Sequence, residues 1–279
     1  MATPQEEVRR TLPSVIDIAY EQYKRNLPLY RLTEDLMTRE VCTIAPEASL
    51  DQAARIMGDK HIGSLIVTKY RTPVGIVTER DLLSKVLAYG ILLIDQTVEG
   101  VMSYPLAGIS VSTKLKEVAR AMTNKKGRLA VFDAGTLVGI ITSSDLIKSL
   151  PDVPETEVKV DDFMTKKVIM ADEETPVINV AKTMGRERIG SVIITRKGSP
   201  FGIFTERDLL TNFLAKGKDL FTEVGPNCSQ PLVVGASGIS AHRAAAIMAL
   251  KHIRRLPIVK DDQLVGIITA RDLVEVYAK

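Results

Sequence analysis

A seven-residue motif carries the side chains of this chain that are best suited to bind a small molecule. From Gly75 to Asp81 it reads Gly-Ile-Val-Thr-Glu-Arg-Asp, an apolar strand pattern followed by the start of a helix. The free N–H groups at a helix start suit a phosphate, and a short carboxylate can accept two ribose hydroxyls. The arginine before the aspartate could pair with a phosphate. Thr-x-x-Asp is equally the pattern of a helix cap worth roughly 1 kcal/mol, so a purely structural explanation stays open.

The motif occurs four times, which makes the chain a repeat protein. The later copies start at Gly139, Gly202 and Gly266, so the glycines are 64, 63 and 64 residues apart. Before each copy lies an apolar stripe at helical spacing, such as Leu50, Ala53, Ala54 and Met57. We therefore predict an α/β (α+β) fold of four β-α-β-β-α units.

The repeats resemble one another in alternation. Residues 57–88 align without gaps on 184–215 and are identical at 18 of 32 positions, and repeats two and four share Leu-Val-Gly-Ile-Ile-Thr. This indicates duplication of a two-repeat module, with a Pro-rich acidic linker near 151–155. The predicted domains are a helical extension at 1–34 and repeats at 35–96, 97–152, 153–221 and 222–279. The extension either packs on repeat one or serves dimerisation or partner docking.

Composition narrows the function classes. The chain has 279 residues, average globular composition and a net charge of +3, without a dense basic tract, so nucleic-acid binding is not indicated. The two cysteines fall at non-equivalent places in their repeats and the three histidines lack the spacing of metal ligands, so no metal site is predicted. Two unmatched cysteines also fit a reducing cytoplasm. The first residues do not resemble a signal peptide and no apolar run spans a membrane, so a soluble protein is expected. The sequence contains no hydrolase, P-loop or zincin motif, so an enzyme is not predicted. His242 is expected at the surface.

Four such motifs in β-α-β-β-α units resemble the cystathionine-β-synthase (CBS) domain family over about residues 35–279. The resemblance implies that tandem repeats pair into pseudo-twofold Bateman modules, here two of them, organised as in the gamma subunit of AMP-activated protein kinase. It further implies regulatory binding of adenosine compounds, namely AMP, ADP, ATP or S-adenosylmethionine, in clefts between paired repeats.

The resemblance also implies which residues bind a nucleotide. The aspartates would hold ribose and the threonines would contact ribose or phosphate: Asp81, Asp145, Asp208 and Asp272, with Thr78, Thr142, Thr205 and Thr269. Phosphates would meet Arg80, Arg207 and Arg271 and the basic residues after each first helix, Lys60, His61, Arg188, Lys251 and His252. Adenine would lie near Thr43, Ile44 and Met170, beside Gly63, Ser64, Gly190 and Ser191. Repeat two carries Ser143-Ser144 in place of Glu-Arg, and repeat four opens with Cys228-Ser229 in place of Met-Thr. The expected order of occupancy is therefore Asp81 and Asp208, then Asp272, then Asp145.

The leading hypothesis is a non-catalytic adenine-nucleotide sensor that acts on a protein partner or a second copy of the chain. An S-adenosylmethionine-binding regulator and an assembly scaffold with vestigial clefts are the alternatives.

Overall fold

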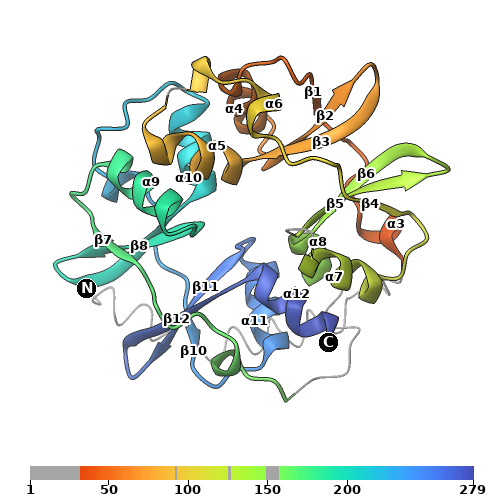
Figure 1. The fold of residues 1–279 in the computed structure, drawn as a ribbon. Coiled ribbons are helices and arrows are strands. Elements are labelled where there is room, and N and C mark those ends of the chain that lie inside the picture. Colours follow the sequence, from red (N-terminus) through yellow and green to blue (C-terminus); the bar gives the residue numbers. More distant parts are fainter. Residues whose placement is uncertain (1–31, 92, 125–126, 149–156) are drawn as a thin grey trace. The chain divides into compact units, whose positions relative to one another are not determined.

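The computed structural model of the chain describes residues 32–91, 93–124, 127–148 and 157–279. Over these residues a strand, a helix, a hairpin and a second helix follow one another four times (Figure 1), which confirms the predicted α/β repeat fold. Most of the predicted N-terminal helical extension lies outside the described residues.

Each repeat contains the same elements. The first strands are β1 (Thr43–Ile44), β4 (Gly108–Ser110), β7 (Met170–Asp172) and β10 (Gly235–Ala236). The first helices are α4 (Leu50–Asp59), α7 (Leu115–Asn124), α9 (Val177–Arg186) and α11 (Ala241–Leu250). The hairpins are β2 (Ser64–Lys69) with β3 (Thr72–Thr78), β5 (Arg128–Asp133) with β6 (Thr136–Thr142), β8 (Ser191–Arg196) with β9 (Ser199–Thr205), and β11 (Arg255–Lys260) with β12 (Gln263–Thr269). The last helices are α5 (Glu79–Lys85), α8 (Ser143–Ile147), α10 (Glu206–Leu209) and α12 (Ala270–Ala278).

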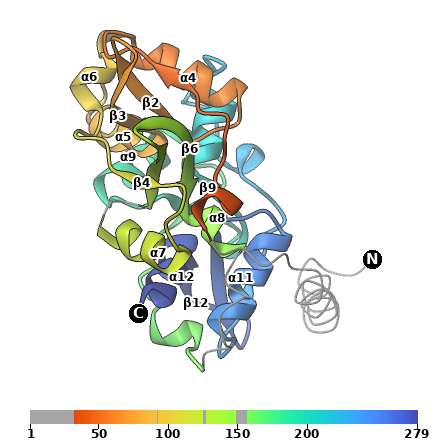
Figure 2. The ribbon, with the colours of Figure 1, turned by 90° about the vertical axis from the view of Figure 1, so that its right-hand side faces the viewer.

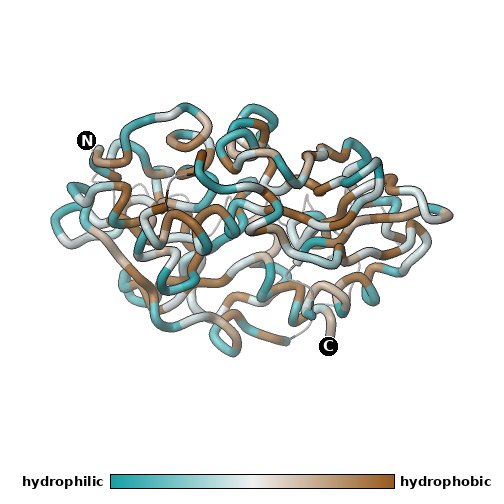
Figure 3. Tube along the Cα trace, turned by 45° about the horizontal axis from the view of Figure 1, so that its top comes forward, coloured by the Kyte–Doolittle hydropathy of each residue, from teal (hydrophilic) through white to brown (hydrophobic). Residues whose placement is uncertain are grey.

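The strands of each repeat form a three-stranded sheet in sequence order. In repeats one, three and four the first strand is parallel to the second, and in every repeat the hairpin is antiparallel. The first helix covers the sheet with its predicted stripe, because Leu50, Ala53, Ala54 and Met57 are all completely buried. Short apolar and polar stretches alternate along the chain in the way that such one-sided elements require (Figure 3).

The described chain divides into two compact units, each built from two repeats that are not neighbours in sequence. Unit 2 comprises residues 39–108 and 167–233, the bodies of repeats one and three. Its core is continuous across both repeats and includes Leu50, Val180 and Phe204, whose ring meets that of Phe213 edge to face at 6.2 Å. Helix α5 packs against α9 and α10 (Figure 1).

Unit 1 joins the bodies of repeats two and four, residues 109–166 and 234–279, with the segment that ends at Thr38. Helix α12 packs on α7 and α8 (Figure 2). The expectation of a surface histidine in this unit is wrong: His242, the second residue of α11, is only 8% exposed. Helix α11 is apolar on most of its circumference and packs on both α8 and α12, so its first turn is buried as well.

The segment that precedes the first strand of each repeat, its opening, binds the motif strand of the neighbouring repeat. Each opening carries a Met or Cys followed by Thr or Ser, and this dipeptide forms a backbone bridge to the isoleucine after the motif glycine. Thr38 of repeat one pairs with Ile140 of repeat two, and Ser103 of repeat two pairs with Ile76 of repeat one. Likewise Thr165 pairs with Ile267, and Ser229 with Ile203. Repeats one and two therefore exchange openings, and so do repeats three and four.

This exchange explains why the motif begins with glycine. A Cβ at Gly139 would lie 2.7 Å from Met37 Sδ and 3.0 Å from the Thr38 carbonyl oxygen. A Cβ at Gly202 would lie 2.5 Å from Cys228 Sγ and 3.1 Å from the Ser229 carbonyl oxygen. Only a residue without a side chain lets the opening come this close. Cys228-Ser229, which looks divergent in sequence, thus occupies the same place as the Met-Thr pairs.

Candidate functional site

The motif threonine and aspartate form a capping box in all four repeats, which confirms the structural interpretation of Thr-x-x-Asp. One carboxylate oxygen, Oδ2, accepts the backbone N–H of the threonine at 2.7–3.0 Å and its hydroxyl at 2.6–2.8 Å. The pairs are Thr78 with Asp81, Thr142 with Asp145, Thr205 with Asp208, and Thr269 with Asp272. The cap therefore uses one oxygen of each aspartate and leaves the other for a further interaction.

The second oxygen, Oδ1, has a different neighbour in each of the first three repeats. Asp81 Oδ1 lies 2.8 Å from Lys85 Nζ, and Asp145 Oδ1 lies 3.4 Å from Lys148 Nζ. Asp208 Oδ1 instead accepts the Ser229 hydroxyl at 3.1 Å. In the fourth repeat burial raises the pKa of Asp272 above the usual carboxyl value, against the opposing effect of its hydrogen bonds from Thr269. The four aspartates are thus equivalent as caps but differ in the surroundings of their carboxylates.

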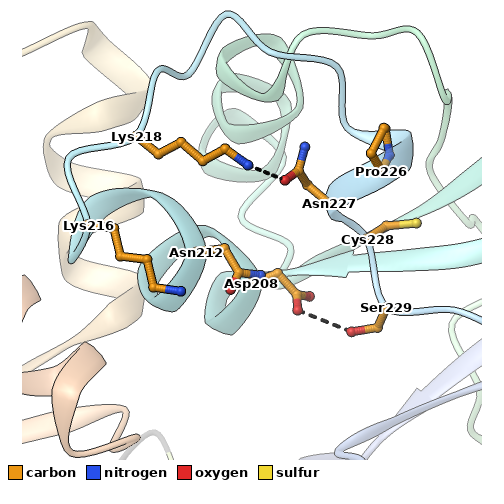
Figure 4. A pocket seen from close by; sticks show the side chains of 8 residues that line it. All are labelled: Asp208, Asn212, Lys216, Lys218, Pro226, Asn227, Cys228 and Ser229. Carbon is orange, nitrogen blue, oxygen red and sulfur yellow. Dashed lines mark hydrogen bonds between the residues drawn. The ribbon is translucent and has the colours of Figure 1, made fainter.

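A pocket of about 420 Å³ opens beside Asp208 in unit 2 (Figure 4). It lies between the start of the last helix of repeat three and the opening of repeat four. The helix side contributes Asp208, Asn212, Lys216 and Lys218, and the opening contributes Pro226, Asn227, Cys228 and Ser229. A π-helix at Leu210–Leu214, closed by the bond from Ala215 N to the Leu210 carbonyl at 2.9 Å, precedes Lys216. Single π-helical turns are frequent at functional sites.

The polar groups of this pocket combine a carboxylate with two ammonium groups. Lys218 Nζ donates to Asn227 Oδ1 at 2.6 Å and lies 5.0 Å from the centroid of the Phe213 ring. Lys216 is exposed on the same side of the pocket as Asp208 (Figure 4). Burial raises the pKa of the Cys228 thiol, which donates to the Gly225 carbonyl and so lines the wall in its neutral form. The arrangement can accept hydroxyl hydrogens at one end and bind an anion at the other.

The predicted arginines of repeats one and three join the two repeats within unit 2. Arg80 Nε lies 3.0 Å from Glu206 Oε1, and Arg207 Nε lies 3.4 Å from Glu79 Oε1. Each arginine also donates to a carbonyl of the other repeat, Arg80 to Arg188 at 3.3 Å and Arg207 to His61 at 2.9 Å. Repeats two and four lack the Glu-Arg pair, and Arg271 contacts Glu275 in its own helix at 3.0 Å.

The predicted basic residues after the first helices terminate those helices. Equivalent residues adopt left-handed backbone conformations, with φ of 54° at His61, 55° at Arg188 and 54° at His252. The next residue donates to the helix, as in the 2.9 Å bond from Ile62 N to the Met57 carbonyl. This is the hydrogen-bond pattern of a Schellman C-cap. Lys60 and Lys251 are the exposed C-cap residues that precede the left-handed ones.

The predicted adenine-contacting residues lie on strand ends. Thr43 is exposed and Ile44 buried on β1, whereas Met170 on β7 is 54% exposed. Ser64 and Ser191 begin β2 and β8 and are half-buried. The carbonyls of the preceding glycines accept N–H groups of the last helices, Gly63 from Glu79 at 3.2 Å and Gly190 from Glu206 at 3.1 Å.

Asp208 alone among the eight lining residues of the pocket was predicted from the sequence. Lys216, Lys218, Asn212 and Asn227 were missed because they fall outside the conserved-spacing motif, in stretches where the repeats differ. The available signal was the 127-residue offset between repeats one and three, which, continued past the gapless alignment, sets Tyr89 and Ile91 against the two lysines.

None of the described helices is both long and apolar enough to cross a membrane. The described residues also hold no group of three or more His, Cys, Asp or Glu side chains that could bind a metal ion.

The chain is similar to several archaeal proteins. It is 28% identical over 272 residues to protein MJ1404 of Methanocaldococcus jannaschii, an alignment that covers 90% of this chain but only 63% of that protein. It is 30% identical over 220 residues to protein MJ1225 of the same organism, covering 72% of this chain and 77% of that protein.

Solved structures show the same fold. The crystal structure of MJ1225, described as a candidate archaeal homologue of g-AMPK, superposes with a TM-score of 0.73 and 20% identity, over 89% of this chain and all of the other. A conserved Pyrococcus horikoshii protein superposes with a TM-score of 0.61 and 21% identity over 88% of this chain and 99% of the other. The family model described as CBS domain matches four segments, residues 33–88, 98–152, 160–215 and 224–279, which make up more than half of the chain. The chain therefore belongs to the CBS domain family.

Proposed function

We propose that this protein is a non-catalytic regulator that binds an adenine nucleotide, AMP, ADP or ATP, with the pocket beside Asp208 as its principal site. The observation that carries the proposal is the joint presence of a carboxylate and two lysines around one pocket. The second oxygen of Asp208 and the Ser229 hydroxyl would meet the ribose diol. Lys216 and Lys218 would meet the phosphates. Adenosine as the nucleoside comes from membership of the CBS domain family.

The charges of the pocket favour a nucleotide over S-adenosylmethionine. Both lysines attract phosphate oxygens by charge-assisted hydrogen bonds. S-adenosylmethionine has no phosphate and carries a positive sulfonium, so the lysines would repel it. We therefore expect affinity to rise with the number of phosphates and to be weakest for S-adenosylmethionine.

Binding would regulate by joining the two walls of the pocket. One wall is the last helix of repeat three and the other is the opening of repeat four. A ligand that holds both walls shifts the protein towards the arrangement in which they are close, provided that it binds this arrangement better than the alternative. The readout would be the activity of a partner protein or the assembly of a second copy. Two free cysteines, Cys42 and Cys228, fit action in the reducing cytoplasm.

Calorimetric titration of the ligand-free protein with adenosine, AMP, ADP, ATP and S-adenosylmethionine tests the proposal. Lys216→Ala and Lys218→Ala should each weaken ATP binding about tenfold, since a hydrogen bond to a charged group contributes roughly 1.5–3 kcal/mol. Adenosine binding should be unchanged in both. Lys166→Ala, an exposed lysine outside the pocket, is the matched control.

Asp208→Asn should weaken adenosine and ATP alike, because the amide cannot replace the carboxylate at the ribose. Thermal unfolding of the same variant checks that the helix cap is retained. If the folded protein binds none of the five compounds, the nucleotide assignment is wrong, and the motif aspartates serve only as helix caps in an assembly scaffold.

A further inference from the structure

The motif aspartates of repeats one and three have the same backbone frame and different surroundings. Asp81 and Asp208 cap equivalent helices, and Ser103 and Ser229 are bridged to equivalent isoleucines of the motif strands. The gapless alignment of the two repeats sets Lys85 against Asn212. The same 127-residue offset, continued just past the end of that alignment, sets Tyr89 against Lys216 and Ile91 against Lys218. The surroundings of Asp81 and Asp208 therefore share the same backbone and differ in their side chains.

In repeat one a lysine of the chain occupies the position beside Asp81 Oδ1 that a ligand hydroxyl would need. Lys85 is the last residue of α5, and its ammonium lies 2.8 Å from Asp81 Oδ1. The same ammonium donates to the backbone carbonyl of Val101, in the opening of repeat two. The Asp81 side chain is only 8% exposed. The ammonium adds the attraction between two opposite charges to a hydrogen bond of the kind that a ribose hydroxyl could also make to the carboxylate.

In repeat three no ammonium group of the described chain occupies the position beside Asp208 Oδ1, which faces the pocket. Asn212 stands where repeat one has the lysine. Within the described residues, Asp208 Oδ1 accepts one long hydrogen bond, from the Ser229 hydroxyl at 3.1 Å. The cations lie further along the chain, at Lys216 and Lys218, where they line the pocket beside the carboxylate instead of neutralising it. The counterparts of these cations in repeat one, Tyr89 and Ile91, offer no charge to an anionic ligand.

We propose that Lys85 is an internal occupant of the Asp81 site, so that of the two odd-numbered repeats only repeat three accepts an external nucleotide. The proposal rests on the proposed function, nucleotide binding beside Asp208, and assigns its specificity to position 85 in one repeat and 212 in the other.

Exchanging the two residues tests this assignment. Asn212→Lys places the occupant beside Asp208 and should weaken ATP binding at least tenfold in calorimetry. Asp81→Asn should leave ATP binding by the otherwise unchanged protein within twofold. The triple variant Lys85→Asn, Tyr89→Lys and Ile91→Lys should add one ATP site per chain, and a further Asp81→Asn should remove it. Lys69→Asn, an exposed lysine of the same repeat, is the control and should add none.

The outcomes separate this inference from the proposed function. If the unchanged protein binds ATP and Asp81→Asn weakens that binding as much as Asp208→Asn does, the inference is overturned while the nucleotide function stands. Undiminished binding by the folded Asn212→Lys protein has the same meaning, and this arm does not depend on the triple variant folding. If the unchanged protein binds no nucleotide, both fail together.

Discussion

Replacing Gly202 by alanine should destabilise unit 2 by pushing away the opening of repeat four. The new Cβ would lie 2.5 Å from Cys228 Sγ and 3.1 Å from the Ser229 carbonyl oxygen. Apolar atoms pack best at about 3.5–4.0 Å, so the opening must move by roughly 1 Å. Overpacking of this kind typically costs about 1–3 kcal/mol. Because the opening also carries Ser229 and Asn227, the same displacement should weaken nucleotide binding.

Urea unfolding followed by circular dichroism measures the loss of stability, and calorimetry measures the loss of binding. Gly100→Ala is the matched control, since its Cβ would meet nothing closer than Thr97 Oγ1 at 3.8 Å. Gly100 lies in the short helix α6 (Val98–Val101), where alanine is the better helix former, so this variant should be as stable as the natural chain or more so.

A double variant identifies the colliding atom. Cys228→Ala removes Sγ, so in its presence Gly202→Ala should cost less than it does alone, a coupling that a double-mutant cycle detects. If Gly202→Ala is as stable as Gly100→Ala, the close approach of the opening is not the reason for the motif glycine, and the reasoning is refuted.

Three further predictions concern the caps, the ion pairs and the carboxyl groups. Thr269→Ala should destabilise the protein by about 1 kcal/mol in urea unfolding, because it removes the cap of α12, and Thr269→Ser should restore most of this. Glu206→Gln should cost about 1 kcal/mol, since Arg80 is half-exposed and water screens the pair, and a cycle with Arg80→Met that shows no coupling would contradict this. The stability that Asp272 contributes relative to Asp272→Asn should fall as pH rises from 3.8 through its raised pKa. Asp161 has a pKa lowered by hydrogen bonds from Ser237 and Gly238, so its contribution relative to Asp161→Asn should be complete above pH 3.8 and lost as pH falls through its folded pKa. The two slopes should therefore have opposite signs, and a slope of the wrong sign would refute the assignment for that residue.

The repeat architecture could be predicted because its signals are local and recur. The stripe Leu50, Ala53, Ala54 and Met57 has the period of a helix, and the run from Gly75 to Asp81 joins a strand to a capped helix within seven residues. A pattern that depends on a few neighbouring residues survives in every copy, so each copy supports the others.

The site could be predicted only in part, because its second wall comes from a distant segment. The residues around Ser229 in the sequence do not indicate that it will pair with Ile203. The exchange of openings depends on the packing of the repeats, which a local pattern does not encode. Lys216 and Lys218 have no basic counterpart in repeat one, where Tyr89 and Ile91 take their places, so a motif shared by the repeats does not include them. The sequence also contains no sign that Glu206 of another repeat lies 3.0 Å from Arg80, so this ion pair could not be predicted.

The exchange of openings also bears on how such a chain could be inherited and divided. A gene fragment that encodes a single repeat would lack the opening that pairs with its motif strand. It would also carry an opening whose partner strand is missing. Two consecutive repeats are the shortest stretch in which every opening and every motif strand find their counterparts. The 127-residue offset between Gly75 and Gly202 is the length of that stretch. Duplication by pairs therefore keeps every exchange of openings intact, whereas duplication of a single repeat does not.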